Sequence, residues 1–98
     1  MAEQIMKVTV VHNEAAERFE ADLDGQVAVA EYQREGDTLY FTHTETPTAY
    51  RGRGIAGQVV ESALAYVKAN GLTVVPLCPF VARYIAEHPE YQALLAQR

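Results

Sequence analysis

The chain has 98 residues and a formal net charge of −5; 49% of its residues are hydrophobic and 21% are charged. This length and composition exclude a disordered chain and predict a single domain, residues 1–98, with one core. We find no apolar run long enough to span a membrane and no signal-peptide pattern, so we expect a cytoplasmic protein without a membrane partner. The acidic balance also argues against binding nucleic acid through its phosphates.

The predicted strands occupy the first half of the chain. Apolar and polar residues alternate with the period of a β-strand in four segments, which are residues 6–12, 18–23, 26–33 and 38–45. Asp24-Gly25 is a strong hairpin signal, and Glu35-Gly36-Asp37 forms the next turn. These signals predict a meander of short antiparallel strands.

The hydrophobic period changes after Pro47. From Ile55 onward it becomes helical, because apolar residues fall at positions 55, 59, 60, 63, 64 and 67. Asn70-Gly71 ends this amphipathic helix, since glycine adopts the left-handed conformation that commonly follows a helix.

A strand and a second helix complete the predicted order. Residues 73–77 form a short apolar, β-branched run, which is typical of a buried strand. Pro79 opens a second helical pattern that is interrupted at His88-Pro89, and residues 91–96 could resume it. The order β-β-β-β-α-β-α indicates an α+β (layered α/β) fold, in which a central β-α-β crossover joins a parallel pair to a mostly antiparallel sheet.

Charge is distributed unevenly along the chain. Residues 1–45 carry ten acidic against three basic side chains, whereas residues 46–98 carry three acidic against five basic ones. A basic half can hold a small anion, and an acidic half can attract a cationic amine. For most of the acids, solvated strand edges and loops are an equally good explanation.

Cysteine and histidine usage limits the chemistry. The one cysteine, Cys78, cannot form a disulfide within the chain, which fits a reducing cytoplasm. His12, His43 and His88 are scattered without the spacing of metal ligands, so we predict no metal site. We interpret His12 and His88 as structural.

The segment from Arg51 to Gly57, RGRGIAG, concentrates glycine and positive charge directly before the first helix. It lies at the carboxyl end of the fourth strand, where folds with this crossover bind their ligands. Free N–H groups and the dipole at a helix start attract anions, so we predict that a pyrophosphate binds there. The alternative is a glycine-rich turn with solvated arginines.

Two well-known phosphate motifs do not account for this segment. The Walker A pattern fails because no Lys-Ser or Lys-Thr follows the glycines. Residues 52–57 match G-x-G-x-x-G, but the dinucleotide fold requires an acid about 20 residues further on and repeated β-α-β units. The region around Leu77 holds no acid, and the upstream meander is the wrong architecture.

A third pattern, R-x-x-G-x-A at Arg51, Gly54 and Ala56, resembles the signature of the GNAT N-acetyltransferase superfamily, which binds acetyl-coenzyme A. The resemblance extends over essentially the whole chain and is that of the minimal, single-domain GNAT-like proteins. Its motifs are HTETP (43–47), YRGRGIA (50–56), VPLCPFV (75–81), Tyr84 and HPEY (88–91). Typical members carry two helices after the first strand, for which residues 13–17 leave no room, so elements that commonly shape the acceptor site are missing.

The resemblance implies acetyl-coenzyme A as cofactor. In that fold the fourth and fifth strands separate and pantetheine lies between them, and a proline at the end of a strand supplies no ladder donor. The cofactor-binding residues implied are Thr46, Pro47, Arg51, Gly52, Arg53, Gly54, Ile55, Ala56 and Gly57.

The resemblance also implies catalytic candidates. Cys78 would accept the acetyl group or lie against it, although burial would raise its pKa and a small buried hydrophobe is the alternative. Tyr84 would protonate the departing thiolate; the alternative is a core tyrosine with its hydroxyl at the surface. By alternation, His43 and Glu45 share the face of Leu39 and Phe41, and either could deprotonate the amine unless both are simply the polar end of the strand.

These residues predict an acetyl-coenzyme A-dependent N-acetyltransferase that acts on an amine, either a small molecule or a lysine side chain. Direct transfer is preferred to an acetyl-cysteine intermediate. A non-catalytic acyl-coenzyme A-binding module is the alternative, because the acceptor-site helices are missing. A small structural or interaction domain without a ligand is a third reading.

Overall fold

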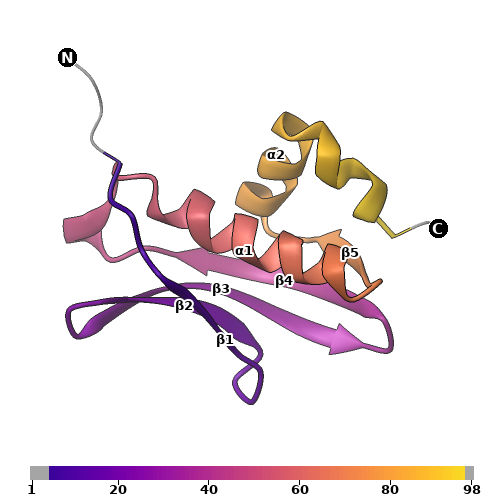
Figure 1. Cartoon of the computed structure of the whole chain (residues 1–98), viewed down its shortest axis with the longest axis horizontal. Coiled ribbons are helices and arrows are strands. Elements are labelled where there is room, and N and C mark those ends of the chain that lie inside the picture. Colours follow the sequence, from indigo (N-terminus) through magenta and orange to yellow (C-terminus); the bar gives the residue numbers. More distant parts are fainter. Residues whose placement is uncertain (1–4, 97–98) are drawn as a thin grey trace.

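The structure is a computed structural model that describes residues 5–96. A sheet of five strands in the order β1-β2-β3-β4-β5 carries both α-helices, which lie above it in Figure 1. The elements in chain order are β1 Val10–Asn13, β2 Arg18–Leu23, β3 Gln26–Glu35, β4 Thr38–Glu45, the 3₁₀ helix η1 Thr48–Tyr50, α1 Ile55–Ala69, β5 Thr73–Pro76, α2 Pro79–Glu87 and the 3₁₀ helix η2 Pro89–Leu94.

The strand order and directions confirm the predicted fold class. β1 to β4 form an antiparallel meander, and β5 pairs with β4 in parallel after the crossover through α1. The Asp24-Gly25 hairpin joins β2 to β3, with both residues at positive φ. This mostly antiparallel sheet with a single parallel pair places the start of α1 just beyond the carboxyl end of β4.

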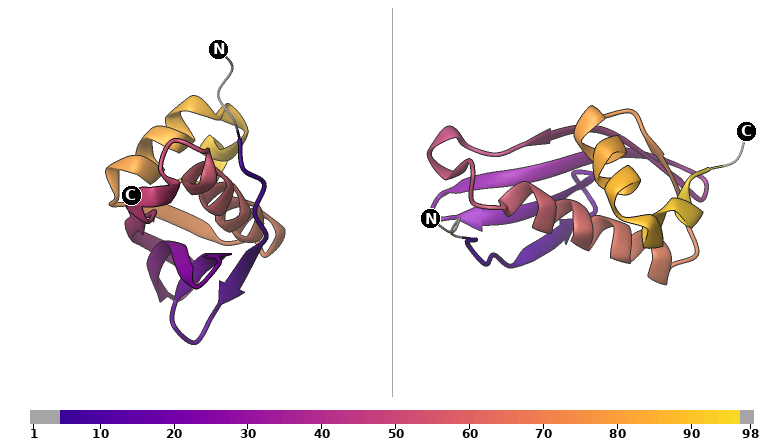
Figure 2. Two further views of the ribbon diagram at one scale, coloured as in Figure 1. Left: turned by 90° about the vertical axis from the view of Figure 1, so that its left-hand side faces the viewer. Right: turned by 90° about the horizontal axis from the view of Figure 1, so that it is seen from above.

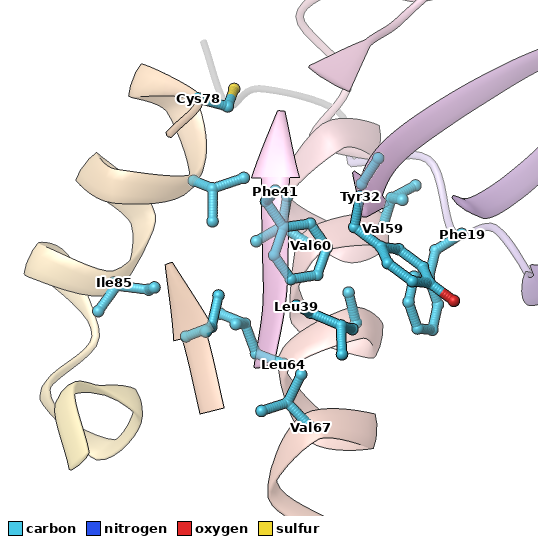
Figure 3. Packing of buried hydrophobic residues seen from close by; sticks show 14 of the residues in the cluster. Phe19, Tyr32, Leu39, Phe41, Val59, Val60, Leu64, Val67, Cys78 and Ile85 are labelled. Atoms are coloured by element: carbon cyan, nitrogen blue, oxygen red, sulfur yellow. The ribbon is translucent and has the colours of Figure 1, made fainter. Parts of the chain in front are cut away.

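The core lies between α1 and the sheet. Every apolar position predicted for the inner face of α1 is buried, from Ile55 to Val67. These side chains pack on Phe19, Tyr32 and Phe41 of three different strands, as the close view in Figure 3 shows. Asn70 caps the helix and Gly71 follows at φ 65°, so the predicted stop is confirmed.

The first strand is shorter than its alternation predicts. Residues 6–12 were expected, but β1 begins at Val10, and residues 6–8 instead form hydrogen bonds with Arg53 and Gln58 near the start of α1. Met6, Val8 and Val10, which form one side of the predicted alternation, all pack against the core. The alternation therefore reports which side is buried and not which partner supplies the hydrogen bonds.

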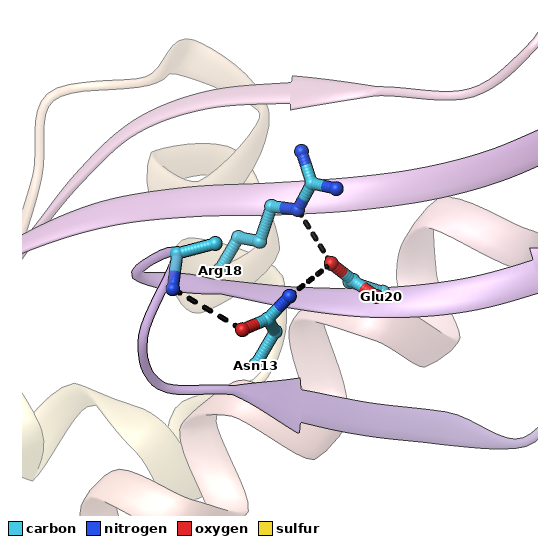
Figure 4. Close-up of polar contacts among 4 residues, drawn as sticks. Asn13, Arg18 and Glu20 are labelled. Carbon is cyan, nitrogen blue, oxygen red and sulfur yellow. Dashed lines mark hydrogen bonds and ion pairs between the residues drawn. The ribbon is translucent and has the colours of Figure 1, made fainter.

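A polar cluster closes the short connection from β1 to β2. Asn13 donates from Nδ2 to Glu20 Oε2 at 2.9 Å, and Arg18 donates from Nε to the same oxygen at 2.6 Å (Figure 4). Asn13 Oδ1 accepts the backbone N–H of Ala16 at 3.1 Å. Hydrogen bonds from Arg18 and then Asn13 hold the pKa of Glu20 below its ordinary value of 4.5.

The last elements differ in detail from their predictions. β5 ends at Pro76, and Leu77, expected as its last residue, is 60% exposed. After α2 the chain continues as a 3₁₀ helix and then returns to the sheet, where the N–H of Ala96 donates to the carbonyl oxygen of Val74 at 2.9 Å. Within residues 5–96, no helix is long and apolar enough to cross a membrane.

We expect Glu20→Gln to destabilise the protein by about 1 kcal/mol or less at pH 7, because it removes the negative charge from a partly exposed ion pair with Arg18. A carboxyl group with a lowered pKa stabilises the folded state fully above its unfolded-state pKa and loses that effect as the pH falls. The difference between the wild type and the variant should therefore shrink below about pH 4.5. Urea denaturation at several pH values measures it, with Glu87→Gln on the exposed face of α2 as the control.

Candidate functional site

A cleft of about 580 Å³ opens where β4 ends and both α-helices begin. Its walls are the end of β4, the loop before α1, the first turn of α1 and the start of α2. The lining residues are His43, Thr44, Glu45, Thr46, Tyr50, Arg51, Gly52, Gly54, Ile55, Ala56, Gly57 and Phe80. Segments far apart in the sequence therefore meet around one opening.

Most of the predicted cofactor residues line this cleft. Pro47 and Arg53 do not. Pro47 borders a second hollow on the neighbouring surface, together with Arg18, Glu31 and Arg51. Arg53 is placed with its guanidinium carbon 5.9 Å from the ring centre of Tyr50, at cation–π distance.

The glycine-rich loop adopts a conformation that requires glycine at two positions. Gly52 has φ 80° and Gly54 has φ 74°, both in the left-handed region that other residues rarely adopt. Gly54 is the N-cap residue of α1, and no side chain among the described residues caps this helix. The first N–H groups of any α-helix lack an intrahelical acceptor, and in α1 they belong to Ile55, Ala56 and Gly57, which line the cleft.

Arg51 is held beside this helix start. Its Nε donates to the carbonyl oxygen of Thr46 at 3.2 Å, across the loop that contains η1. The guanidinium group is exposed and borders the cleft. The loop thus combines free N–H groups, a helix dipole and one positioned positive charge.

The pairing between β4 and β5 ends before β4 does. The parallel register runs from Thr38 opposite Thr73 to Phe41 opposite Pro76, and the N–H of Cys78 donates to the carbonyl oxygen of Phe41 at 2.9 Å. The remaining residues of β4, 42–45, have no register partner in β5. β4 and β5 therefore separate beyond Phe41, as the resemblance implied, and the unpaired edge of β4 borders the cleft.

The predicted facing of His43 and Glu45 is wrong. The register with β3 shifts between Glu31 and Tyr32, so that Tyr32 lies opposite Phe41 and Glu31 lies opposite His43. This β-bulge adds one residue to β4 and reverses the alternation beyond it. His43 and Glu45 therefore lie on the open face of the sheet, whereas Leu39 and Phe41 face the core.

The bulge turns Thr44 to the helix-covered face in their place. Thr44 lies opposite the fully buried Ala30, and its Oγ1 is 3.7 Å from Sγ of Cys78. Thr44, Tyr50 and Phe80 line the cleft but were not predicted as site residues. The position of Phe80 near the cleft could have been inferred from Pro79, which predicts that a helix begins there. No sequence signal predicts the β-bulge that turns Thr44 inward.

Comparison with known proteins adds to this geometry. Residues 18–94 match the family model described as GCN5-related N-acetyltransferase. The chain belongs to the GCN5-related N-acetyltransferase family. Protein NATD1 from Homo sapiens is 35% identical over 95 residues, which cover 94% of this chain and 84% of that protein. Protein NATD1 from Gallus gallus is 34% identical over 97 residues, covering 96% of this chain and 88% of that protein.

A solved structure agrees at the level of the fold. The solution structure of a GCN5-like protein from Staphylococcus aureus superposes with a TM-score of 0.68, covering 100% of this chain and 93% of that one. The sequence identity is 14%, so this likeness concerns the fold alone. The expected membership of a GNAT-like family and the expected fold class are confirmed.

In this N-acetyltransferase fold Cys78 is the N-cap residue of α2 and is 6% exposed; it does not line the cleft but contacts Thr44, which does. Burial raises the pKa of the Cys78 thiol, as expected, but the backbone N–H groups of Val81 and Phe80 and the contact with Thr44 outweigh it and lower the pKa overall. Among residues 5–96, no side chain forms a capping hydrogen bond at the start of α2, so these N–H groups act on the sulfur as nearby dipoles. The expected effect of burial is therefore present, but groups around the sulfur that the sequence pattern did not reveal reverse the net shift of the Cys78 pKa.

Tyr84 lies one turn beyond Phe80 on α2 and does not line the cleft. Its hydroxyl donates to Glu61 Oε1 at 3.3 Å, and its ring stacks on His88 with centroids 3.8 Å apart. Burial, followed by the neighbouring carboxylate of Glu61, raises the pKa of the Tyr84 hydroxyl. The tyrosine is thus protonated at neutral pH, with its proton directed at Glu61.

The two histidines interpreted as structural make interior contacts. His12 stacks on Phe19 with centroids 4.0 Å apart, and its Nε2 lies 2.5 Å from the Tyr32 hydroxyl. His88 Nδ1 lies 2.7 Å from the carbonyl oxygen of Tyr84. His43, in contrast, is exposed, and its Nε2 lies 3.1 Å from Oε1 of Glu45.

We expect Thr44→Val to move the titration of Cys78 to higher pH. The substitution keeps the shape of the side chain but removes a hydroxyl that stabilises the thiolate. Ultraviolet absorbance of the thiolate as a function of pH measures the change. Thr42→Val, an exposed position on the same strand, should leave the titration unaltered; equal curves for all three proteins would contradict the role of Thr44.

Proposed function

We propose that this protein is an acetyl-coenzyme A-dependent N-acetyltransferase, with the pyrophosphate at the start of α1. One observation carries the proposal: a cleft along the free edge of β4 ends at a glycine-rich helix start that has no cap among the described residues. Membership of the N-acetyltransferase family supports the same ligand.

The residues at the start of α1 fit a pyrophosphate. Free backbone N–H groups and the helix dipole favour an anion, and glycine at positions 52 and 54 provides the left-handed turns that expose them. Arg51 adds a positive charge at the rim. Ala56 and Gly57 carry no bulky side chain, so a phosphate can approach the main chain of the first turn of α1 closely.

The rest of the cleft fits a long, narrow thioester. Backbone groups of β4 beyond Phe41 have no partner in β5 and are available to pantetheine amides. Phe80 and Ile55 supply apolar walls. A chain that followed this edge from α1 toward the end of β5 would bring its sulfur near Thr44 and Cys78.

Acetyl transfer forms a bond between the amine nitrogen and the acetyl carbonyl carbon and breaks the carbon–sulfur bond of the thioester. The amine must lose a proton and the departing thiolate must gain one. We assign the first task to the His43–Glu45 pair on the open face of the sheet, which an amine reaches from the side opposite the core. Tyr84 would supply the second proton only if its hydroxyl left Glu61 and turned toward the cleft.

The acceptor we propose is an amine, either a small molecule or a lysine side chain. Glu31 and Glu45, together with Arg18 and Arg51, border the second hollow, which adjoins the cleft through Glu45, Thr46 and Arg51. We propose that the amine approaches through this hollow beside the two carboxylates, while the cofactor lies in the cleft.

A non-catalytic acyl-coenzyme A-binding module is the second candidate. The short connection between β1 and β2, residues 14–17, favours it, because the helices that shape the acceptor site in larger relatives are replaced by a tight turn. Such a module would bind the cofactor in the same cleft and turn over no amine.

We expect acetyl-coenzyme A to raise the melting temperature of the wild type by several degrees, because a ligand at 100 times its dissociation constant adds about 2.7 kcal/mol of stability. NADH, which also carries a pyrophosphate, should have little effect. Arg51→Gln should reduce the shift, whereas Arg83→Gln on the exposed face of α2 should not. A wild type that melts at one temperature with and without acetyl-coenzyme A would contradict the proposal.

We expect Cys78→Ala to keep most of the acetyl transfer to an amine, because direct transfer is the preferred route. The measurement is release of free coenzyme A thiol over a panel of amines, with the melting temperature as a check on folding. Loss of turnover in a folded variant, together with an acetyl group found on Cys78 of the wild type by mass spectrometry, would indicate the covalent route instead. Turnover by neither protein on any amine would favour the binding module.

A further inference from the structure

The N-terminal segment, residues 5–8, is attached to the glycine-rich loop and not to the sheet. The N–H of Met6 donates to the carbonyl oxygen of Arg53 at 3.0 Å. In Figures 1 and 2 this indigo segment runs beside the start of α1 before it reaches β1. None of residues 5–8 lines the cleft, so the loop has the cleft on one side and this segment on another.

Gln58, in the first turn of α1, connects the same segment to the helix. Its Oε1 accepts the N–H of Val8 at 3.1 Å, and its Nε2 donates to the carbonyl oxygen of Met6 at 2.6 Å. Nε2 also lies 3.2 Å from the carbonyl oxygen of Gly54. One amide side chain thus replaces a neighbouring strand for residues 6–8 and reaches the N-cap residue of the helix.

Ile5 completes this contact from the apolar side. A Cβ atom added to Gly54 would lie 3.0 Å from Cδ1 of Ile5, so the isoleucine covers the glycine directly. Two features therefore disfavour any larger residue at position 54: the φ of 74° and the Ile5 side chain that lies over the glycine. The covering segment and the left-handed turn act on the same residue.

A loop with glycines at positions 52 and 54 is costly to order, because glycine loses more backbone freedom than any other residue when it is fixed. A ligand that had to order the loop would bind more weakly by that amount. Contacts that hold the loop in the free protein remove part of this cost. In the described residues, such contacts come from Gln58, Met6 and Ile5.

We propose that Gln58 is a positioning residue for the pyrophosphate loop. Its side chain hydrogen-bonds to Met6 and Val8 on one side and to Gly54 on the other. These contacts hold the loop in place and thereby keep the free N–H groups of α1 oriented toward the cleft. Gln58 does not line the cleft, so it acts through Gly54 and not on the ligand. This inference rests on the proposed function and adds to it a residue outside the family signature.

The test is Gln58→Met, which keeps the length of the side chain and removes its hydrogen bonds. Dissociation constants are measured by NMR titration with acetyl-coenzyme A and with acetyl-pantetheine, which lacks the pyrophosphate. We expect acetyl-coenzyme A to bind about three- to tenfold more weakly, since a few hydrogen bonds of ordinary net strength are lost, and acetyl-pantetheine to bind as it does to the wild type. The amide hydrogen of Met6, which is bonded to the carbonyl oxygen of Arg53 in the loop, should also exchange faster.

The control variant is Asn70→Ala, which removes a hydrogen bond from Nδ2 to the carbonyl oxygen of Tyr66, 2.9 Å long, at the other end of the same helix. It should leave both dissociation constants unchanged. Unchanged binding of acetyl-coenzyme A to Gln58→Met would overturn the inference, and so would an equal loss for both ligands, which indicates general loosening.

Failure of the proposed function and failure of this inference give different results. A wild type that binds neither ligand would overturn the proposed function and this inference with it, whereas a wild type that binds and a variant that binds equally well would overturn the inference alone. If Gln58→Met does not fold, Gln58→Asn serves instead, because the shorter amide cannot span the same distances, and the same results decide.

Discussion

The two pairings of β4 are the constraint on which the rest of the structure depends. β4 is antiparallel to β3 along its length but parallel to β5 only as far as Phe41 and Pro76. A parallel neighbour requires a crossover, and α1 supplies it while covering the core face of the sheet. Because the crossover begins beyond the end of β4, the first turn of α1 and the strand edge that β5 leaves unpaired line the same cleft.

The bulge in β4 gives the two ends of this strand different environments. Before it, Leu39 and Phe41 are buried under α1. After it, Thr44 faces the sulfur of Cys78, while His43 and Glu45 lie on the open face. One additional residue thus places His43 and Glu45, which we propose as proton acceptors, on one face of the sheet and Thr44, beside Cys78, on the other.

Two helix starts meet at the cleft, and both carry the partial positive charge of unpaired N–H groups. The start of α1 lies at the outer end, where we propose the pyrophosphate binds. The start of α2 lies at the inner end, where its N–H groups lower the pKa of the Cys78 thiol despite burial. The same physical device would therefore serve a phosphate at one end and a sulfur at the other.

The sequence by itself determined the elements and the family. Period-2 and period-3.6 patterns located the strands and the buried face of α1, and RGRGIAG located the loop at which we propose that a pyrophosphate binds. These features depend on local spacing and backbone preference, which a sequence displays directly. Tertiary structure decided what depends on partners: the bulge opposite Glu31, the attachment of residues 6–8 to Gln58, and the environment of Cys78. A register shift and a contact across 50 residues leave no periodic trace, because each is selected by the energy of the packed molecule.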